Sequence, residues 1–82
     1  MGFVYILLSL KDQKTYTGST DNLDRRLKQH NSGQVKSTND RLPMKLLFTE
    51  TFETLSEARK RELWWKSGAG RRKLKEYFEE HT

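Results

Sequence analysis

A nearly continuous apolar run near the amino terminus constrains the fold more than any other feature of this chain. Residues 3–10 (FVYILLSL) have the length and composition of a strand buried on both faces. The polar stretch 11–14 and the β-favouring residues 15–17, which precede Gly18, predict that the chain turns back as a hairpin. With 82 residues, of which 33% are hydrophobic, the chain can build one modest core, so we expect a single domain over residues 1–82.

The middle of the chain predicts a helix that follows the hairpin. Leu23 and Leu27 lie four residues apart and give an apolar stripe to a helix over residues 22–31, with Asp21 or Thr20 as its N-cap. The Asn-Ser-Gly sequence that follows is typical of a helix end. A polar loop then leads to the single proline of the chain.

The last half of the chain predicts a strand and two helices. Residues 44–52 have the composition of a third strand. Thr54 and Glu57 have the spacing of a capping box, which predicts a helix that runs to about Lys66 and is ended by residues 67–70. The inner face of a terminal helix is marked by Leu74, Tyr77 and Phe78. The predicted order is ββαβαα, an α+β fold with a small three-stranded antiparallel sheet flanked by helices.

Composition excludes several classes of protein. The absence of cysteine rules out disulfide scaffolds, thiol catalysis and zinc or iron–sulfur sites built on cysteine. No apolar run approaches the roughly 20 residues that a membrane span needs. The first residues lack the basic start of a signal peptide. We therefore expect a soluble, cytoplasmic protein with no membrane partner.

Positive charge is concentrated in two stretches of a chain whose net charge is +5. Between residues 59 and 75, eight cations accompany a single acid, Glu62, and between residues 25 and 45, six cations accompany only Asp40. Nucleic acid is the simplest partner for such stretches. A solvated face laced with ion pairs explains the charge pattern equally well. His81 lies close to the end of the chain, and we assign it no role.

Polar and aromatic side chains on the hairpin and first helix are candidates for a site. Tyr5 and Tyr16 lie on successive strands, with Gly18 two residues after the second. Taken alone, such tyrosines are more often core residues or cross-strand pairs. Arg26 and His30, four residues apart, share a helix face with two leucines, which indicates a helix that covers the sheet at one edge and lines a cleft at the other.

Glu62 is the candidate metal ligand, because it is the single acid in the basic stretch 59–75. One hypothesis is an ion pair with Arg59 or Lys66, each within one helical turn. The other is a ligand to a hard cation, since Mg²⁺ is often held by one carboxylate together with water and substrate phosphate. The spacing supports both equally. The glycine-rich residues 68–70, which precede two arginines, could bring backbone amides close to a phosphate.

Taken together, these elements resemble the GIY-YIG nuclease family over nearly the whole chain. The resemblance rests on five elements in order, namely Phe3-Val4-Tyr5, Tyr16-Thr17-Gly18, Arg26, His30 and Glu62. It is strongest to the small single-domain members, of the UPF0213 type, in which Gly-Ser-Thr-Asp-Asn-Leu leads into Arg-Arg-Leu-x-x-His-Asn, as at residues 18–31. Related domains are the catalytic module of homing endonucleases and of the incision subunit in bacterial excision repair.

The resemblance implies a metal-dependent endonuclease with one active site per chain. Glu62 would hold one Mg²⁺ or Mn²⁺, and Arg26 would pair with a non-bridging phosphate oxygen. Tyr5 or Tyr16 would act as the base or position the attacking water, helped by a basic cleft that lowers the phenol pKa. His30 would relay a proton or orient a tyrosine. DNA is favoured over RNA as the substrate, and targeting would come from this module or from a protein partner.

Nucleic acid would also be contacted outside the catalytic residues, by Gly18, Lys28, Lys66, Arg71 and Arg72. Gly18 would let the backbone approach a phosphate, and the cations would track the strand without sequence preference. One departure from the family keeps a second hypothesis open: several family nucleases carry an asparagine after the catalytic glutamate, and this chain has none. The alternatives are therefore a nucleic-acid-binding module that has lost cleavage, or an interaction domain whose basic face only confers solubility.

Overall fold

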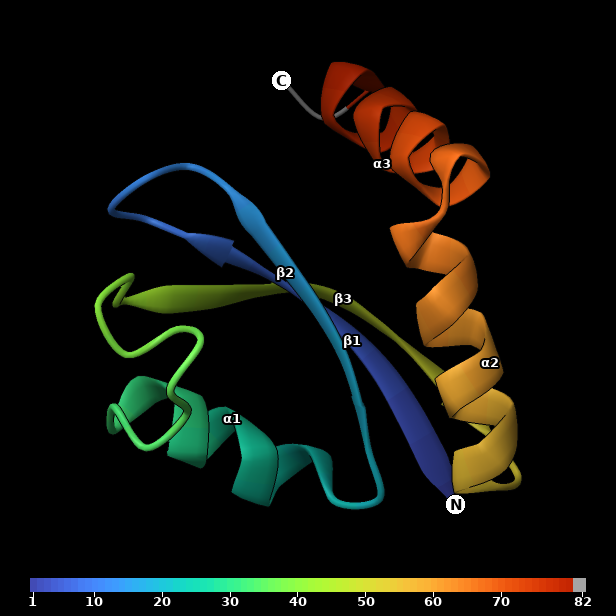
Figure 1. Cartoon of the computed structure of the whole chain (residues 1–82), viewed down its shortest axis with the longest axis horizontal. Helices are drawn as coiled ribbons and strands as arrows, with labels where there is room; N and C mark the ends of the chain where they lie inside the picture. The colour runs from blue at the N-terminus through green and yellow to red at the C-terminus, as the bar shows by residue number, and fades with distance from the viewer. Residues whose placement is uncertain (81–82) are drawn as a thin grey trace.

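The computed structural model describes residues 1–80, which form an antiparallel sheet with helices against both of its faces (Figure 1). The elements in chain order are β1 (Gly2–Ser9), β2 (Thr15–Thr20), α1 (Leu23–Asn31), β3 (Met44–Phe52), α2 (Leu55–Lys66) and α3 (Gly68–Glu80). The sheet has three strands in the order β2-β1-β3. The predicted α+β fold with ββαβαα order is confirmed. His81 lies outside the described residues.

The central position of β1 explains its continuous apolar sequence. Val4 and Ile6 lie in one core cluster with the α2 residues Ala58 and Trp65, while Tyr5 and Leu7 lie in a second cluster on the α1 side. No strand residue from Val4 to Leu7 is more than 1% exposed. The prediction of a strand buried on both faces is therefore correct, and alternate residues of β1 serve the two helix layers.

Helix α2 begins as the sequence predicts, whereas α1 uses a different cap. The backbone N–H of Glu57 donates to Thr54 Oγ1 at 3.2 Å, so Thr54 caps α2. The cap of α1 is Asn22, whose side chain accepts from the backbone N–H of Arg25. The expectation of Asp21 or Thr20 in that role is wrong, because the Thr20 hydroxyl instead bonds to the backbone N–H of Asn22 and holds the turn before the helix.

The junction of α2 and α3 is shorter than predicted. Only Ser67 separates the two helices, and Gly68–Gly70 forms the first turn of α3. Gly70 is buried, and a β-carbon there would overlap the backbone of Trp65. Gly70 therefore permits a close approach of the two helices, and the approach of backbone amides of residues 68–70 to a phosphate stays a prediction.

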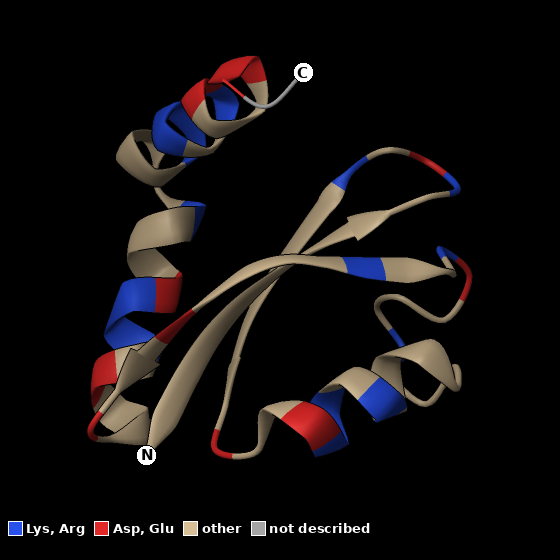
Figure 2. Cartoon of the chain, turned by 180° about the vertical axis from the view of Figure 1, so that it is seen from behind, with Lys and Arg blue, Asp and Glu red and all other residues tan. Residues whose placement is uncertain are grey.

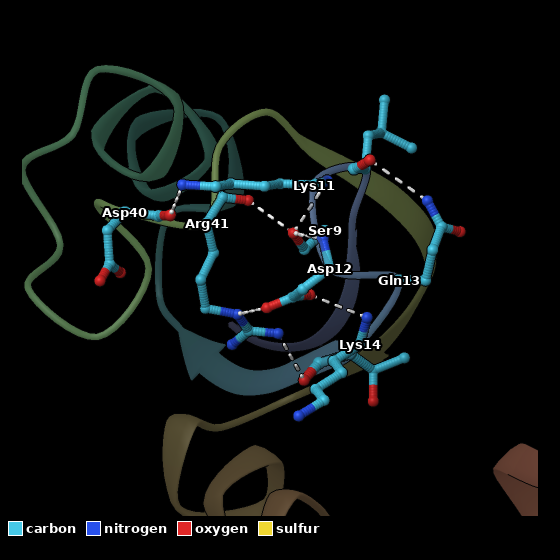
Figure 3. A network of polar contacts seen from close by, with 9 residues as sticks. Ser9, Lys11, Asp12, Gln13, Lys14, Asp40 and Arg41 are labelled. Atoms are coloured by element: carbon cyan, nitrogen blue, oxygen red, sulfur yellow. Dashed lines mark hydrogen bonds and ion pairs between the residues drawn. The ribbon is translucent and has the colours of Figure 1, made fainter.

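The hairpin turn and the loop 32–43 are joined by a network of polar contacts (Figure 3). The Ser9 hydroxyl donates to the backbone carbonyl of Arg41 at 2.6 Å and accepts from the backbone N–H of Lys11 and of Asp12. Asp12 forms an ion pair with Arg41 at 2.8 Å. This hydrogen bond, with one from the backbone N–H of Lys14, lowers the pKa of Asp12 to about 2. The network fixes the loop that lies over the end of α1.

Charged residues are placed on the helices and loops, and the strands carry few of them (Figure 2). β1 and β2 contain none, and β3 contains only Lys45 and Glu50. Among the described residues, no helix is long and apolar enough to cross a membrane. The positive charge noted in the sequence therefore lies mainly on the two helix layers.

Candidate active site

The hydroxyl of Tyr5 is the centre of a buried polar cluster on the α1 side of the sheet. Tyr5 lies on the central strand and is 1% exposed, and its register partner on β2 is Gly18. A β-carbon at Gly18 would overlap the Tyr5 hydroxyl and ring. Because Gly18 is itself buried, its missing side chain makes room for the phenol, and the approach of its backbone to a phosphate stays a prediction.

Two residues of α1 converge on this hydroxyl. Arg26 Nε donates to the Tyr5 oxygen at 3.3 Å, and His30 Nε2 lies 3.0 Å from it. The four-residue spacing that the sequence shows places both side chains on the face of α1 that meets the sheet. His30 is fully buried, and its Nδ1 lies 2.8 Å from Thr38 Oγ1. Three of the predicted catalytic residues, Tyr5, Arg26 and His30, therefore form one hydrogen-bonded chain.

Tyr16 lies beside this cluster on the edge strand β2. Its ring centroid is 5.0 Å from that of His30, in an edge-on arrangement, and 6.3 Å from that of Tyr5. Tyr16 is less buried than Tyr5. Both tyrosines thus belong to the core cluster of the α1 side, as expected for aromatic residues on a hairpin. They also lie close to the same histidine, His30.

The protonation states of the cluster follow from burial and from Arg26. Burial raises the pKa of Tyr5 above its ordinary value of 10.0, and the hydrogen bond from Arg26 only partly offsets this rise. The expectation that a basic cleft lowers the phenol pKa is wrong for this tyrosine. Burial, together with the nearby guanidinium, lowers the pKa of His30 to about 4, so His30 is neutral at pH 7. The hydrogen bond with Tyr5 raises the pKa of Arg26, which remains charged.

Glu62 lies on α2 and is held by two partners. Ser19 Oγ, from β2, donates to Oε1 at 2.5 Å, and Lys66 Nζ lies 2.6 Å from Oε2. The Glu62 side chain is 19% exposed, whereas the Lys66 side chain is 50% exposed. The ion-pair hypothesis for Glu62 is therefore confirmed, with Lys66 as the partner. Its charge is close enough to Tyr5 to contribute to the raised pKa of that phenol.

The surroundings of Glu62 fit a divalent cation that takes most of its ligands from water and substrate. The described residues include no cluster of three acidic or histidine side chains that could enclose a metal ion. Mg²⁺ does not need one, because it keeps several water ligands and is commonly held by one or two carboxylates and a phosphate. Glu62 would be the protein ligand, and the half-exposed Lys66 would have to give up its contact with Oε2.

A groove of about 360 Å³ separates β2 from α2 and α3. It is lined by Thr15, Tyr16, Thr17, Trp65, Lys66, Arg71 and Leu74. Of the cations predicted to contact nucleic acid, Lys66 and Arg71 line this groove. Lys28, on α1, and Arg72, on α3, are exposed and lie outside its lining. Tyr16 touches both regions, so the groove and the buried cluster meet at the edge of the sheet.

Two residues of the site were not predicted. Ser19 orients Glu62, and it could have been noticed because it follows Gly18 in the segment that supports the family resemblance. Thr38 contacts His30 from a polar loop that has no recognisable motif. Only the folding of that loop over α1 brings Thr38 to the histidine, so the sequence carried no signal for it.

Comparison with known proteins agrees with this geometry. The family model described as the GIY-YIG catalytic domain matches residues 1–78. A UPF0213 protein of Clostridium perfringens is 45% identical over 75 residues, which cover 90% of this chain and 80% of the relative. A UPF0213 protein of Bacillus licheniformis is 40% identical, over 93% of this chain and 78% of the relative.

The fold is shared with a solved structure of the same kind. The solution NMR structure of a UPF0213 protein from Bacillus halodurans has a TM-score of 0.55 and 38% sequence identity, and the match covers 94% of this chain and 85% of that chain. The family model and the solved structure therefore both cover the part of the chain that carries the candidate site residues. This chain belongs to the GIY-YIG family of nucleases.

Proposed function

We propose that this protein is a metal-dependent endonuclease that hydrolyses phosphodiester bonds in DNA. The observation that carries the proposal is the convergence of Arg26 and His30 on the Tyr5 hydroxyl, at 3.3 and 3.0 Å. A buried tyrosine that only filled the core would need one partner for its hydroxyl. A charged guanidinium and a neutral imidazole on the same phenol form the arrangement that proton transfer next to a phosphate requires.

Tyr5 is the residue that we assign as the general base. As the attacking water forms its bond to phosphorus, it transfers a proton to the Tyr5 oxygen, and the phenolic proton of Tyr5 moves to His30 Nε2. His30 can accept it because it is neutral at pH 7. This coupled transfer avoids a free phenolate, which the raised pKa of Tyr5 disfavours.

Arg26 stabilises the charge that develops in this step. Its Nε is already on the Tyr5 oxygen, and the planar guanidinium has further N–H groups that can bond to a non-bridging phosphate oxygen. Tyr16 packs against His30 and orients the substrate at the mouth of the groove. Glu62 would hold one Mg²⁺ or Mn²⁺, which would supply charge neutralisation at the scissile phosphate.

The groove between β2 and the two C-terminal helices is the proposed path of the strand. Lys66 and Arg71 line it and would contact phosphates, while Trp65 and Leu74 form its apolar wall. Because phosphate contacts release counterions, binding should weaken steeply as salt rises. Lys66 would exchange its ion pair with Glu62 for a phosphate of the substrate.

The direct test is cleavage of plasmid and short-oligonucleotide DNA in the presence of Mg²⁺, Mn²⁺ or a chelator. Glu62→Gln should abolish cleavage, while the control Glu53→Gln, which changes an exposed carboxylate just before α2, should cut normally. Arg26→Ala should also be inactive, and its neighbour Arg25→Ala, whose side chain is exposed, should be active. Wild-type cleavage by Glu62→Gln or Arg26→Ala would overturn the assignment.

A second function is supported by the ion pair between Glu62 and Lys66. If that pair persists when DNA is bound, the protein is a nucleic-acid-binding module of the same fold without cleavage. The two functions separate in one experiment, because a binding module gives salt-sensitive DNA binding and no product with either metal. In that case Glu62→Gln should leave binding unchanged or strengthen it, since it removes a negative charge beside the groove.

A further inference from the structure

We infer that Thr38 is a positioning residue that holds His30 in the tautomer able to accept the Tyr5 proton. Its hydroxyl lies 2.8 Å from His30 Nδ1, on the side of the ring opposite to Tyr5. The consequence for cleavage rests on the proposed function, whereas the tautomer itself is a property of the folded protein. Two measurements can therefore separate a failure of this inference from a failure of the nuclease proposal.

The direction of the hydrogen bonds follows from the donors available at each end. Arg26 Nε can only donate to the Tyr5 oxygen, and the Tyr5 hydroxyl must then place its single proton on another acceptor. His30 Nε2, at 3.0 Å, is the acceptor that the structure provides. If Nε2 carried a proton, the phenol oxygen would face two donors and its own proton would have no partner.

The same direction continues through Thr38. A neutral imidazole whose Nε2 accepts must carry its proton on Nδ1, so Nδ1–H donates to Thr38 Oγ1. The Thr38 hydroxyl proton then points to the backbone carbonyl of Val35, at 3.4 Å. The chain Arg26, Tyr5, His30, Thr38, Val35 thus runs in one direction, from an obligatory donor to an obligatory acceptor.

Burial makes Thr38 the group that selects this tautomer. Thr38 and His30 are both fully buried, so water does not compete for Nδ1. In such an environment, a ring N–H without a partner is strongly disfavoured. The tautomer of His30 is therefore set at one end by Arg26, which leaves the Tyr5 proton to be accepted by Nε2, and at the other end by Thr38 Oγ1, which accepts from Nδ1–H.

The loop that carries Thr38 is itself held in place. The backbone N–H of Arg41 donates to the Thr38 carbonyl at 2.9 Å. Arg41 is fixed in turn by its ion pair with Asp12 and by the hydrogen bond from Ser9 to its carbonyl (Figure 3). The contacts between the hairpin turn and the loop 32–43 therefore fix the position of the Thr38 hydroxyl.

The test is a ¹⁵N NMR measurement of the histidine side chains of the full chain at pH 7. Wild-type His30 should show a protonated Nδ1 and an unprotonated Nε2, and the variant His81→Gln assigns the signal to His30. Thr38→Val, which removes the hydroxyl at nearly constant shape, should shift His30 towards the Nε2–H form. Thr38→Ser should restore the wild-type signal, and Ser37→Ala, at an exposed neighbour, should leave it unchanged.

Cleavage kinetics give the second measurement. Thr38→Val should lower kcat by about tenfold, the lower end of the loss seen when metal-binding histidines lose an orienting partner, with little change in DNA affinity. Thr38→Ser should recover most of this loss. A wild-type His30 protonated on Nε2, or a Thr38→Val spectrum like that of the wild type, overturns the inference. Absence of cleavage in every variant with the expected spectra would overturn only the nuclease proposal.

Discussion

The two sides of the β2 edge differ in how their polar groups are paired. On the α1 side, which we call the closed side, Tyr5, His30 and Thr38 are almost fully buried. They form a continuous chain of hydrogen bonds that begins at Arg26. On the α2 side, which we call the open side, Glu62 is paired with Lys66, whose half-exposed side chain lines the groove between β2 and the two C-terminal helices.

This difference separates the groups that must keep their geometry from the groups that must exchange partners. A proton-transfer chain works when its atoms are held in place before the substrate arrives, because reorganisation would add to the barrier. A metal and phosphate site must instead release its resident contacts when the substrate binds. Lys66 is suited to that exchange, since an exposed ion pair of this type contributes only about 0.3–0.5 kcal/mol.

The two tyrosines provide the sharpest test of the closed side. Tyr5→Phe keeps the ring but removes the hydroxyl, and we expect cleavage to fall by about 10²–10⁴-fold, the usual contribution of a general base. Tyr16→Phe should have a smaller effect, because Tyr16 contacts His30 through its ring, which is retained. Single-turnover cleavage rates, with circular dichroism to show that both variants fold, measure this. A larger loss for Tyr16→Phe would reverse the assignment of the base.

Gly18 tests how tightly the closed side is packed. Gly18→Ala adds a methyl group where the Tyr5 hydroxyl lies, so the phenol must move. We expect a loss of about 1–3 kcal/mol in the free energy of unfolding, as is usual for overpacking, together with reduced cleavage. Urea unfolding measures the first effect. Gly68→Ala is the matched control, because a β-carbon there meets only the end of the Arg72 side chain at 3.7 Å, and it should not destabilise.

The acid stability of the protein reports whether His30 is buried in its neutral form. The folded-state pKa of His30 is about 4, against an ordinary value of 6.5. Between these values the unfolded chain binds a proton that the folded protein does not, so stability is full above pH 6.5 and falls as the pH drops towards 4. Thermal unfolding should show this decline in the wild type and a weaker one in His30→Gln.

Asp12 should add a separate effect at lower pH. Its pKa is about 2 in the folded protein, against an ordinary value of 3.8, so its contribution is present above pH 3.8 and is lost as the pH falls through 2. Asp12→Asn should therefore leave the His30 decline unchanged. Equal declines in the wild type and His30→Gln above pH 4 would mean that His30 is not held neutral by burial.

Local sequence predicted the elements whose signals are local. The strand β1 could be predicted because a continuous apolar run has few other uses in a chain this small. The cap at Thr54 could be predicted because its partner Glu57 is three residues away. The start of α3 could not, since Gly68–Gly70 is usually a helix breaker, and here Gly70 is needed for contact between two helices.

The same distinction applies to the candidate site. The pairing of Glu62 with Lys66 and the shared helix face of Arg26 and His30 follow from four-residue spacings. The raised pKa of Tyr5 could not be predicted, because it depends on how completely α1 covers the strand. Thr38 is eight residues from His30 across a loop, and its place depends on contacts with the hairpin turn that no local pattern encodes.

Replacing Lys66 gives the smallest expected effect and tests the open side directly. Lys66→Met removes the ammonium group from Oε2 of Glu62, so the carboxylate should bind Mn²⁺ severalfold more tightly in the absence of DNA, as measured by electron paramagnetic resonance of free Mn²⁺. The same variant should bind DNA more weakly and with a shallower salt dependence, because one phosphate contact is lost.

Lys60→Met is the matched control for Lys66→Met, since it removes an exposed charge from the same helix with no contact to Glu62 among the described ion pairs. It should leave Mn²⁺ affinity unchanged. If both variants gained equally, the effect would come from net charge and not from the ion pair. If neither did, Lys66 would not compete with the cation, and the open side would be as fixed as the closed one. The difference in Mn²⁺ affinity between the two variants therefore decides whether the open side exchanges its contacts while the closed side keeps its geometry.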